Sequence, residues 1–358
     1  MLVVDAHEDI AYNALRYNRD YATSALGIRA AEINSEAVIE NGLACLGRDE
    51  WLSGNVGIIF ATLFSPPYSH YSGSSEHMYY RNSEQAHKLA NNQLNYYLTL
   101  EQKGDLQIIR NRTDLDKVVA SWDELSTGNP IIGLVLLMEG ADPIRSPSEI
   151  EYWYKNGVRM IGPAWAGTRY CGGTGDPGPL TSLGEELLVN MADVHIILDV
   201  SHMSELSFDQ AIEIYEGVVI ASHANPRFAA ELSTPERLLT DLQIHKLVER
   251  DAVIGMVPYN KFLKTDWRKS EGKKSVPIRR LAEMIDYICQ LTGSCQHVGI
   301  GSDFDGGFGS ESIPFPMDTI ADLVMIGDEI ATLGYDPQEV KQFMSENWLR
   351  VLRRGLPE

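Results

Sequence analysis

The chain has 358 residues, 44% of them hydrophobic and 22% charged, so it is long enough to bury a large core. Fifty acidic residues against 30 basic ones give a formal net charge of −20, which argues against nucleic acid and anionic membrane surfaces as partners. The four scattered cysteines lack CxxC spacing, so we expect reduced thiols. No signal-peptide pattern precedes the first apolar segment, and no apolar run approaches the roughly 18 residues of a membrane helix. We therefore expect a cytoplasmic protein.

Apolar stretches of strand length recur along the chain, and each ends in a polar or aromatic residue. Some are almost wholly apolar, which is typical of parallel strands that are covered on both faces. Amphipathic helical patterns lie between them, for example at 83–102 and 278–291. The eight stretches are 2–9, 56–64, 131–139, 158–165, 195–202, 218–223, 252–259 and 298–305.

This alternation predicts a single α/β domain over residues 1–358, a (β/α)8 or TIM barrel. The chain exceeds the roughly 250 residues typical of that fold, and we expect the surplus in extended loops at the catalytic, C-terminal face. The candidate loops are 11–55, 65–82 and 261–280.

Residues suited to bind a metal ion or a substrate stand where the predicted strands end. His7 and Asp9 face the same side, because alternate residues of a strand point in the same direction. In a parallel barrel all strand ends meet at one rim, where catalytic residues belong. The later strands end in Glu139, Trp165, His202, His223, Tyr259, Asp303 and Asp305.

Three histidines and several carboxylates on one rim suit zinc. Because they outnumber the three protein ligands of a catalytic site with one zinc ion, we expect two zinc ions that share a carboxylate. The remaining histidines do not end a predicted strand, and we interpret them as surface or packing residues. They are His70, His77, His87, His195, His245 and His297.

Several short motifs, taken together and in this order, resemble the membrane (renal) dipeptidase family. That family consists of metallopeptidases of the amidohydrolase type, with a binuclear zinc centre in a (β/α)8 barrel. The resemblance covers most of the chain. The matching motifs are VDAHED at 4–9, MEG at 138–140, LTSLG at 180–184, LDVSH at 198–202, SH at 222–223 and GIGSDFDG at 299–306.

The resemblance implies a role for each matching residue. His7 and Asp9 would bind one zinc ion, His202 and His223 the other, and Glu139 would bridge both. Asp303 would carry the proton when a metal-bridged hydroxide attacks the amide. We expect Asp305 to stabilise the turn instead.

Four further residues are expected to contact the substrate. By the resemblance, Arg237 would bind the terminal carboxylate, although Leu238 stands where the family usually has Asn. Trp165 replaces a family His that helps to stabilise the tetrahedral intermediate. An indole donates one hydrogen bond but cannot accept one, so we expect a compensating donor, for which Arg169 is the nearest candidate. Tyr259 is the fourth expected contact.

We therefore predict a zinc dipeptidase acting on small peptides with a free carboxylate, with a D-residue at the C-terminus left open. One alternative is an amidohydrolase acting on another N-acyl amino acid or a lactam. Another is a metal-binding relative that has lost turnover. The sequence also leaves open a homodimer.

Overall fold

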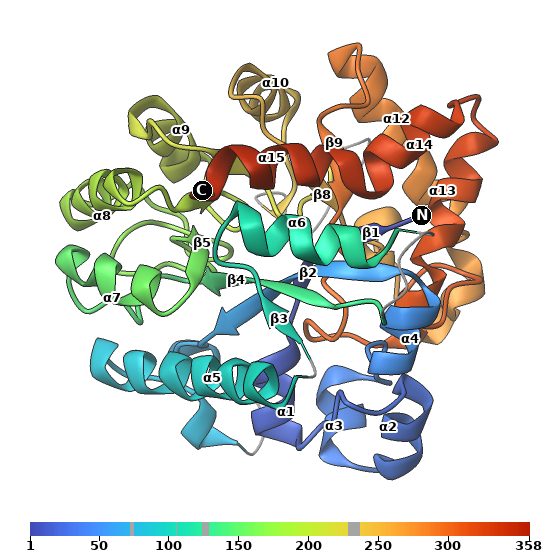
Figure 1. The fold of residues 1–358 in the computed structure, drawn as a ribbon, viewed down its shortest axis with the longest axis horizontal. Helices are drawn as coiled ribbons and strands as arrows, with labels where there is room; N and C mark the ends of the chain where they lie inside the picture. The colour runs from blue at the N-terminus through green and yellow to red at the C-terminus, as the bar shows by residue number, and fades with distance from the viewer. Residues whose placement is uncertain (72–74, 105, 124–128, 228–236) are drawn as a thin grey trace.

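A closed ring of parallel strands forms the centre of the computed structural model, which describes residues 1–71, 75–104, 106–123, 129–227 and 237–358. The strands follow the order β7-β6-β5-β4-β2-β1-β9-β8. A parallel bridge between Ala221 and Ile254 joins the two ends of this series, as expected for the predicted (β/α)8 barrel (Figure 1). The strands are β1 (Val3–Glu8), β2 (Val56–Phe64), β3 (Gln107–Ile108), β4 (Gly133–Glu139), β5 (Val158–Gly162), β6 (Ile197–Asp199), β7 (Val219–Ile220), β8 (Ile254–Met256) and β9 (Val298–Ile300).

All eight predicted strands are present, and the structure adds β3, which pairs with β4 outside the ring. Several strands are shorter than the apolar stretches that predicted them. The fifth prediction began at His195, but this residue has a φ of 58°, a left-handed conformation that cannot continue a strand. β6 therefore begins only at Ile197.

Helices surround the ring of strands (Figure 1). Many of them begin at a side chain that accepts a backbone N–H, such as Asn82 before α5 and Thr181 before α8. The helices are α1 (Ile10–Tyr17), α2 (Ala25–Ala31), α3 (Glu36–Asn41), α4 (Arg48–Ser53), α5 (Ser83–Lys103), α6 (Arg112–Ser121), α7 (Ile150–Lys155), α8 (Ser182–Asp193), α9 (Glu205–Ile214), α10 (Asp241–Glu249), α11 (Asn260–Leu263), α12 (Arg279–Thr292), α13 (Val324–Ala331), α14 (Pro337–Lys341) and α15 (Asn347–Gly355). Of the helices in the described ranges, none is both long enough and apolar enough to cross a membrane.

Two apolar cores lie on the two sides of the barrel wall. One core packs the strands against the surrounding helices. The other fills the barrel and continues into α6 and α15, which Figure 1 shows lying across one end of it. There the Trp348 indole donates a hydrogen bond of 2.9 Å to the carbonyl of Ile300 and contacts the Phe60 ring edge to face. These helices close the end of the barrel where the amino ends of the strands lie. Access to the interior is therefore at the carboxyl ends of the strands.

All three predicted loops contain regular structure. The stretch 261–280 contains most of α11 and two 3-10 turns, Lys269–Glu271 and Lys273–Ser275. The stretch 11–55 contains most of α1 and all of α2, α3 and α4. The stretch 65–82 contains two 3-10 turns, Tyr68–His70 and Glu76–Met78, and its residues 72–74 lie outside the described ranges. The stretches 11–55 and 65–82 both contribute to the pocket at the strand ends.

Candidate metal and substrate site

The predicted site residues share a common position relative to their strands. Trp165, His202, His223, Tyr259 and Asp303 each lie three residues beyond the last residue of β5, β6, β7, β8 and β9, respectively. Because the strands are parallel, this offset brings all five to the same rim.

The first strand reaches the same rim through an irregularity. Val4 and Ala6 point into the barrel core, so regular alternation would direct Glu8 inward and His7 outward. The pairing of β1 with β2 shifts register between Asp5 and Glu8, as in a β-bulge, which redirects side chains. As a result, His7 faces the centre of the site, and Glu8 accepts a hydrogen bond of 3.0 Å from the Trp51 indole of α4.

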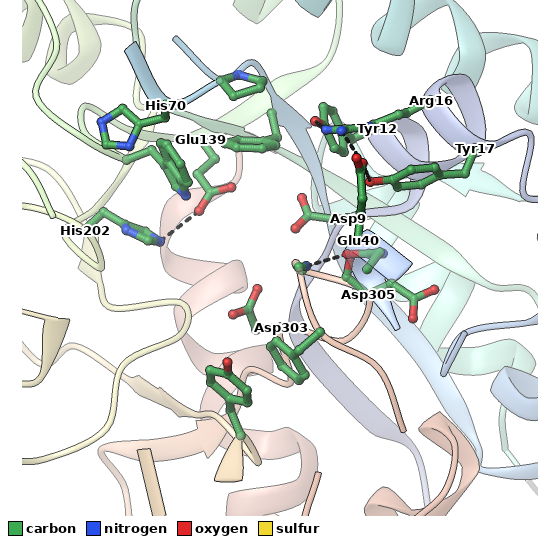
Figure 2. A pocket seen from close by; sticks show the side chains of 18 of the residues that line it. Asp9, Tyr12, Arg16, Tyr17, Glu40, His70, Glu139, His202, Asp303 and Asp305 are labelled. Carbon is green, nitrogen blue, oxygen red and sulfur yellow. Dashed lines mark hydrogen bonds and ion pairs between the residues drawn. The ribbon is translucent and has the colours of Figure 1, made fainter. Parts of the chain in front are cut away.

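Glu139 is the last residue of β4, and Figure 2 shows its carboxylate paired with His202. Its Oε1 lies 3.0 Å from Nε2 of His202 and 3.5 Å from Nε2 of His223. Its Oε2 lies 3.6 Å from Nε2 of His7. The two carboxylate oxygens therefore face two different sets of ligands, which is the geometry of a bridging carboxylate.

The described side chains form three overlapping sets of potential metal ligands, with the ligand atoms of each set within 4.8 Å of one another. Glu139 belongs to two of these sets, one with His7 and Asp9 and the other with His202 and His223. The third set consists of His7, His223 and Asp303. Nε2 of His7 is buried and has no hydrogen-bond partner among the described residues, and the Nε2 atoms of His202 and His223 are only 2.9 Å apart. Metal ions would take the place of protons on these ring nitrogens and give each of them a partner. The residues thus fit two cations, and the structure brings together all five predicted ligands.

Polar groups behind the ligands fix their orientation. The Ser222 hydroxyl lies 2.5 Å from Oδ2 of Asp199 and 2.7 Å from Nδ1 of His223. Because Ser222 donates to the carboxylate, it accepts from Nδ1–H, which leaves the lone pair of Nε2 directed at the site. The Thr174 hydroxyl lies 3.0 Å from Nδ1 of His202. The sequence analysis assigned no role to Asp199 or Ser222, although both fall within the quoted motifs.

The charges of the site are strongly coupled. Burial alone would lower the pKa of His7, but the Glu139, Asp9 and Asp303 carboxylates outweigh it and raise that pKa to about 10. Burial and the Glu139 charge raise the pKa of Asp9 to about 7. A bound cation would therefore have to displace protons from this site at neutral pH.

The pKa values of the other two histidines are lowered instead of raised. Burial, together with the nearby Arg237 guanidinium, lowers the pKa of His202 to about 4. Burial and the positive charge of His7 lower the pKa of His223 well below its usual value. Both imidazoles are therefore neutral at pH 7, the form that binds metal ions.

The two aspartates at the end of β9 have different surroundings. Oδ1 of Asp303 lies 3.9 Å from Nε2 of His7, and the side chain lines the pocket. Burial and the Asp9 charge raise the pKa of Asp303 well above its usual value. The Asp305 carboxylate instead binds the Tyr21 hydroxyl and the Cys45 backbone N–H, both at 2.8 Å, so it anchors the 11–55 stretch.

A cavity of about 350 Å³ opens over these side chains. It has a wall of residues at or beyond the strand ends and a wall from the inserted stretches. The first set is Asp9, Glu139, Trp165, His202, Arg237, Tyr259 and Asp303, and the second is Tyr12, Arg16, Tyr17, Glu40, Asn41, His70 and Tyr79.

Three predicted substrate contacts line this cavity: Arg237, Tyr259 and Trp165. Nη1 of Arg237 donates a hydrogen bond of 3.2 Å to the carbonyl of Ser201, the residue before His202, and its guanidinium lies 5.5 Å from the Phe262 ring. Arg237 is therefore held beside the His202 end of the metal site.

The structure places Arg169 elsewhere and brings in a histidine that the sequence analysis had set aside. Nε of Arg169 lies 3.2 Å from Oδ1 of Asp142, and its Nη2 donates to the carbonyl of Ile144 at 2.7 Å. The guanidinium is thus engaged outside the cavity. His70, which we had interpreted as a surface or packing residue, lines the cavity with its ring 5.2 Å from the Trp165 ring. It belongs to a 3-10 turn in a long insertion, where no strand-end pattern indicated it.

Comparisons with known proteins agree with this geometry. A family model described as membrane dipeptidase (peptidase family M19) matches residues 1–355. A Klebsiella pneumoniae protein named only for its position in the pqqA 5′ region is 30% identical over 233 residues, which is 62% of this chain and 82% of that protein.

Two solved structures share the fold, each with a TM-score of 0.80 and 22% identity. One is dipeptidase AC, a metallopeptidase of family M19, and the superposition covers 100% of this chain and 99% of that one. The other is a Rhodobacter sphaeroides metallopeptidase liganded with a phosphinate mimic of the dipeptide L-Ala-D-Ala, and 99% of each chain is covered.

Proposed function

The chain belongs to the membrane dipeptidase family, peptidase family M19, and on this premise we propose that it is a dipeptidase that uses two zinc ions and acts on dipeptides with a free C-terminal carboxylate. Peptide-bond hydrolysis and the use of metal follow from the family. The two zinc ions, the residue roles and the substrate preference are the proposal.

The observation that carries the proposal is the position of Glu139 between two sets of ligands. Each oxygen of this carboxylate faces a different set, so one side chain can serve two ions. Histidine nitrogen and carboxylate oxygen are ligands that zinc accepts. Two zinc ions would lower the pKa of a water molecule between them and polarise the substrate carbonyl.

The side chains around this centre have complementary tasks. Asp303 lines the cavity beside His7, where it can take a proton from the attacking water and pass it to the departing amine. Arg237 lies near His202 and presents a guanidinium, which binds a carboxylate through two parallel hydrogen bonds. The dipeptide would thus lie with its C-terminal carboxylate at Arg237 and its amide over Glu139.

The stereochemistry of the C-terminal residue belongs to the proposal as well. The Rhodobacter relative was crystallised with a mimic of L-Ala-D-Ala, which supports including D-residues among the substrates.

A second candidate function rests on Trp165. Its indole lies in the cavity, 6.3 Å from the His202 ring, at the position where the family often has a histidine. Because an indole cannot accept a proton, the pocket is less suited to ordinary dipeptides if no other donor compensates. An N-acyl amino acid or a lactam with a free carboxylate would then be the alternative substrate.

A substrate screen of the zinc-loaded protein separates the two functions. We expect hydrolysis of L,L or L,D dipeptides and little activity toward their C-terminal amides. Turnover of N-acyl amino acids or lactams, with no dipeptide cleaved, would favour the second function.

A further inference from the structure

A partly buried ion pair lines the cavity on the side away from His202 (Figure 2). Arg16 of α1 and Glu40 of α3 form it. Neither residue belongs to the ligand sets or to the proton and carboxylate contacts proposed above. The pair therefore has no task in the chemistry, although it faces the same cavity.

Three tyrosines hold the pair in place. Nη1 of Arg16 donates hydrogen bonds of 2.5 Å to the Tyr12 hydroxyl and 3.1 Å to the Tyr79 hydroxyl. Nη2 of Arg16 binds the Glu40 carboxylate, and the Tyr17 hydroxyl donates to Oε2 of Glu40 at 3.0 Å. The guanidinium also lies 5.0 to 5.7 Å from the centres of the three rings. The geometry of the pair is thus preset.

The two members of the pair are unequally accessible. The Arg16 side chain is 5% exposed and the Glu40 side chain 20%. Both described hydrogen bonds to Glu40 end on Oε2, so within the described ranges Oε1 is left to accept another. A molecule in the cavity therefore meets a carboxylate, with its counter-charge buried behind it.

This arrangement selects by charge. An acidic group would approach the Glu40 carboxylate and be repelled, because Arg16 is shielded by Glu40 and the tyrosines. An ammonium or guanidinium group would form a charge-assisted hydrogen bond with the carboxylate.

We infer that Glu40, oriented by Arg16, is a specificity subsite for the side chain of the substrate's amino-terminal residue, and that it favours side chains with a terminal cation such as lysine. This inference rests on the proposed dipeptidase function. With the C-terminal carboxylate at Arg237 beside His202, the amino-terminal residue extends past Asp9 toward α1 and α3. Figure 2 shows His202 and the Arg16–Glu40 pair on opposite sides of the cavity.

The test compares three dipeptides that differ only in the first side chain: Lys-Ala, norleucyl-Ala and Glu-Ala. For the wild type we expect kcat/KM to be about tenfold higher for Lys-Ala than for norleucyl-Ala, and lowest for Glu-Ala. E40Q should abolish the preference for Lys-Ala over norleucyl-Ala. E36Q is the matched control, because Glu36 lies one turn earlier on α3 and is exposed, and it should keep the preference.

Metal content and Tm, measured on each variant, show whether it has folded. Equal kcat/KM for Lys-Ala and norleucyl-Ala in the wild type would overturn the subsite, and so would a preference that survives in folded E40Q. The wild-type series decides the question even if E40Q does not fold.

A binding experiment separates this inference from the proposed function. Phosphinate mimics of Lys-Ala and norleucyl-Ala need only bind, so their Kd values report the subsite without turnover. A protein that cleaves no dipeptide but binds the lysyl mimic about tenfold more tightly would refute the dipeptidase function and support the subsite. Rapid cleavage of dipeptides with equal Kd values for the two mimics would support the dipeptidase function and refute the subsite.

Discussion

The strand ends and the inserted stretches form two walls of one cavity, and they are built differently. The strand-end wall contains the buried histidines and carboxylates, which lie at or near the ends of strands and are tied to their neighbours by hydrogen bonds and ion pairs. The inserted wall comes from α1, α3 and the 65–82 stretch, and it is aromatic and polar without a metal-ligand set in its described residues. In the proposed function, the strand-end wall holds the reacting groups, and the inserted wall contacts the first side chain of the substrate.

The largest effect expected from breaking the strand-end wall is that of Glu139→Ala. Removing the shared carboxylate leaves two residues in each of the two ligand sets that contain Glu139, so we expect the loss of most of both ions and of nearly all turnover. Elemental analysis measures this directly. E40Q, on the inserted wall, is the control and should retain both ions. If Glu139→Ala still holds two ions, Glu139 is not the bridge.

Arg237→Ala should weaken the binding of the substrate carboxylate and leave the metal site occupied. A hydrogen bond to a charged group contributes about 1.5 to 3 kcal/mol, so kcat/KM for dipeptide acids should fall by about tenfold to over a hundredfold. C-terminal amides, which lack the charge, should lose far less. Equal losses on acid and amide would assign Arg237 to the structure of the loop.

Ser222→Ala tests the support behind the ligands. Without the hydroxyl, Asp199 no longer fixes the orientation of His223, and we expect the affinity for the second ion to fall about tenfold to a hundredfold. Competition with a chelator measures that affinity. Ser345 is a buried serine in the turn that precedes α15, and Ser345→Ala should leave the affinity unchanged. The same affinity in both variants would show that the Ser222 contact is only structural.

The smallest expected effect is that of His70→Ala. The imidazole lines the cavity beside Trp165 and can donate a hydrogen bond to a substrate carbonyl, so kcat should fall about tenfold with the metal retained. His77, in the next 3-10 turn of the same stretch, provides the matched control.

Arg169→Met should lower Tm, because its bonds to Asp142 and Ile144 are lost, but not kcat. A lower kcat with an unchanged Tm would instead identify Arg169 as the compensating donor.

The two walls also differ in how well the sequence predicts them. Apolar runs with polar ends identify parallel strands and their rim, so the eight strands and the grouping of the five ligands follow from local pattern. The bulge that turns His7 inward and the short strand β3 leave no such pattern.

The inserted wall depends on contacts that no periodicity encodes. Arg16 and Glu40 are 24 residues apart on two separate helices, and His70 stands in an irregular stretch. Arg169 follows Trp165 by four residues, yet its guanidinium is held by Asp142 and the carbonyl of Ile144. Proximity in sequence was therefore a poor guide to the cavity outside the strand ends.

Titration of the metal-free protein with zinc, followed by dipeptide hydrolysis, tests the two-ion centre most directly. If Glu139 joins two sets of ligands, bound zinc should reach two ions per chain, and activity should rise until the second ion is bound. Saturation of both binding and activity at one ion per chain would contradict the shared carboxylate and the mechanism proposed from it.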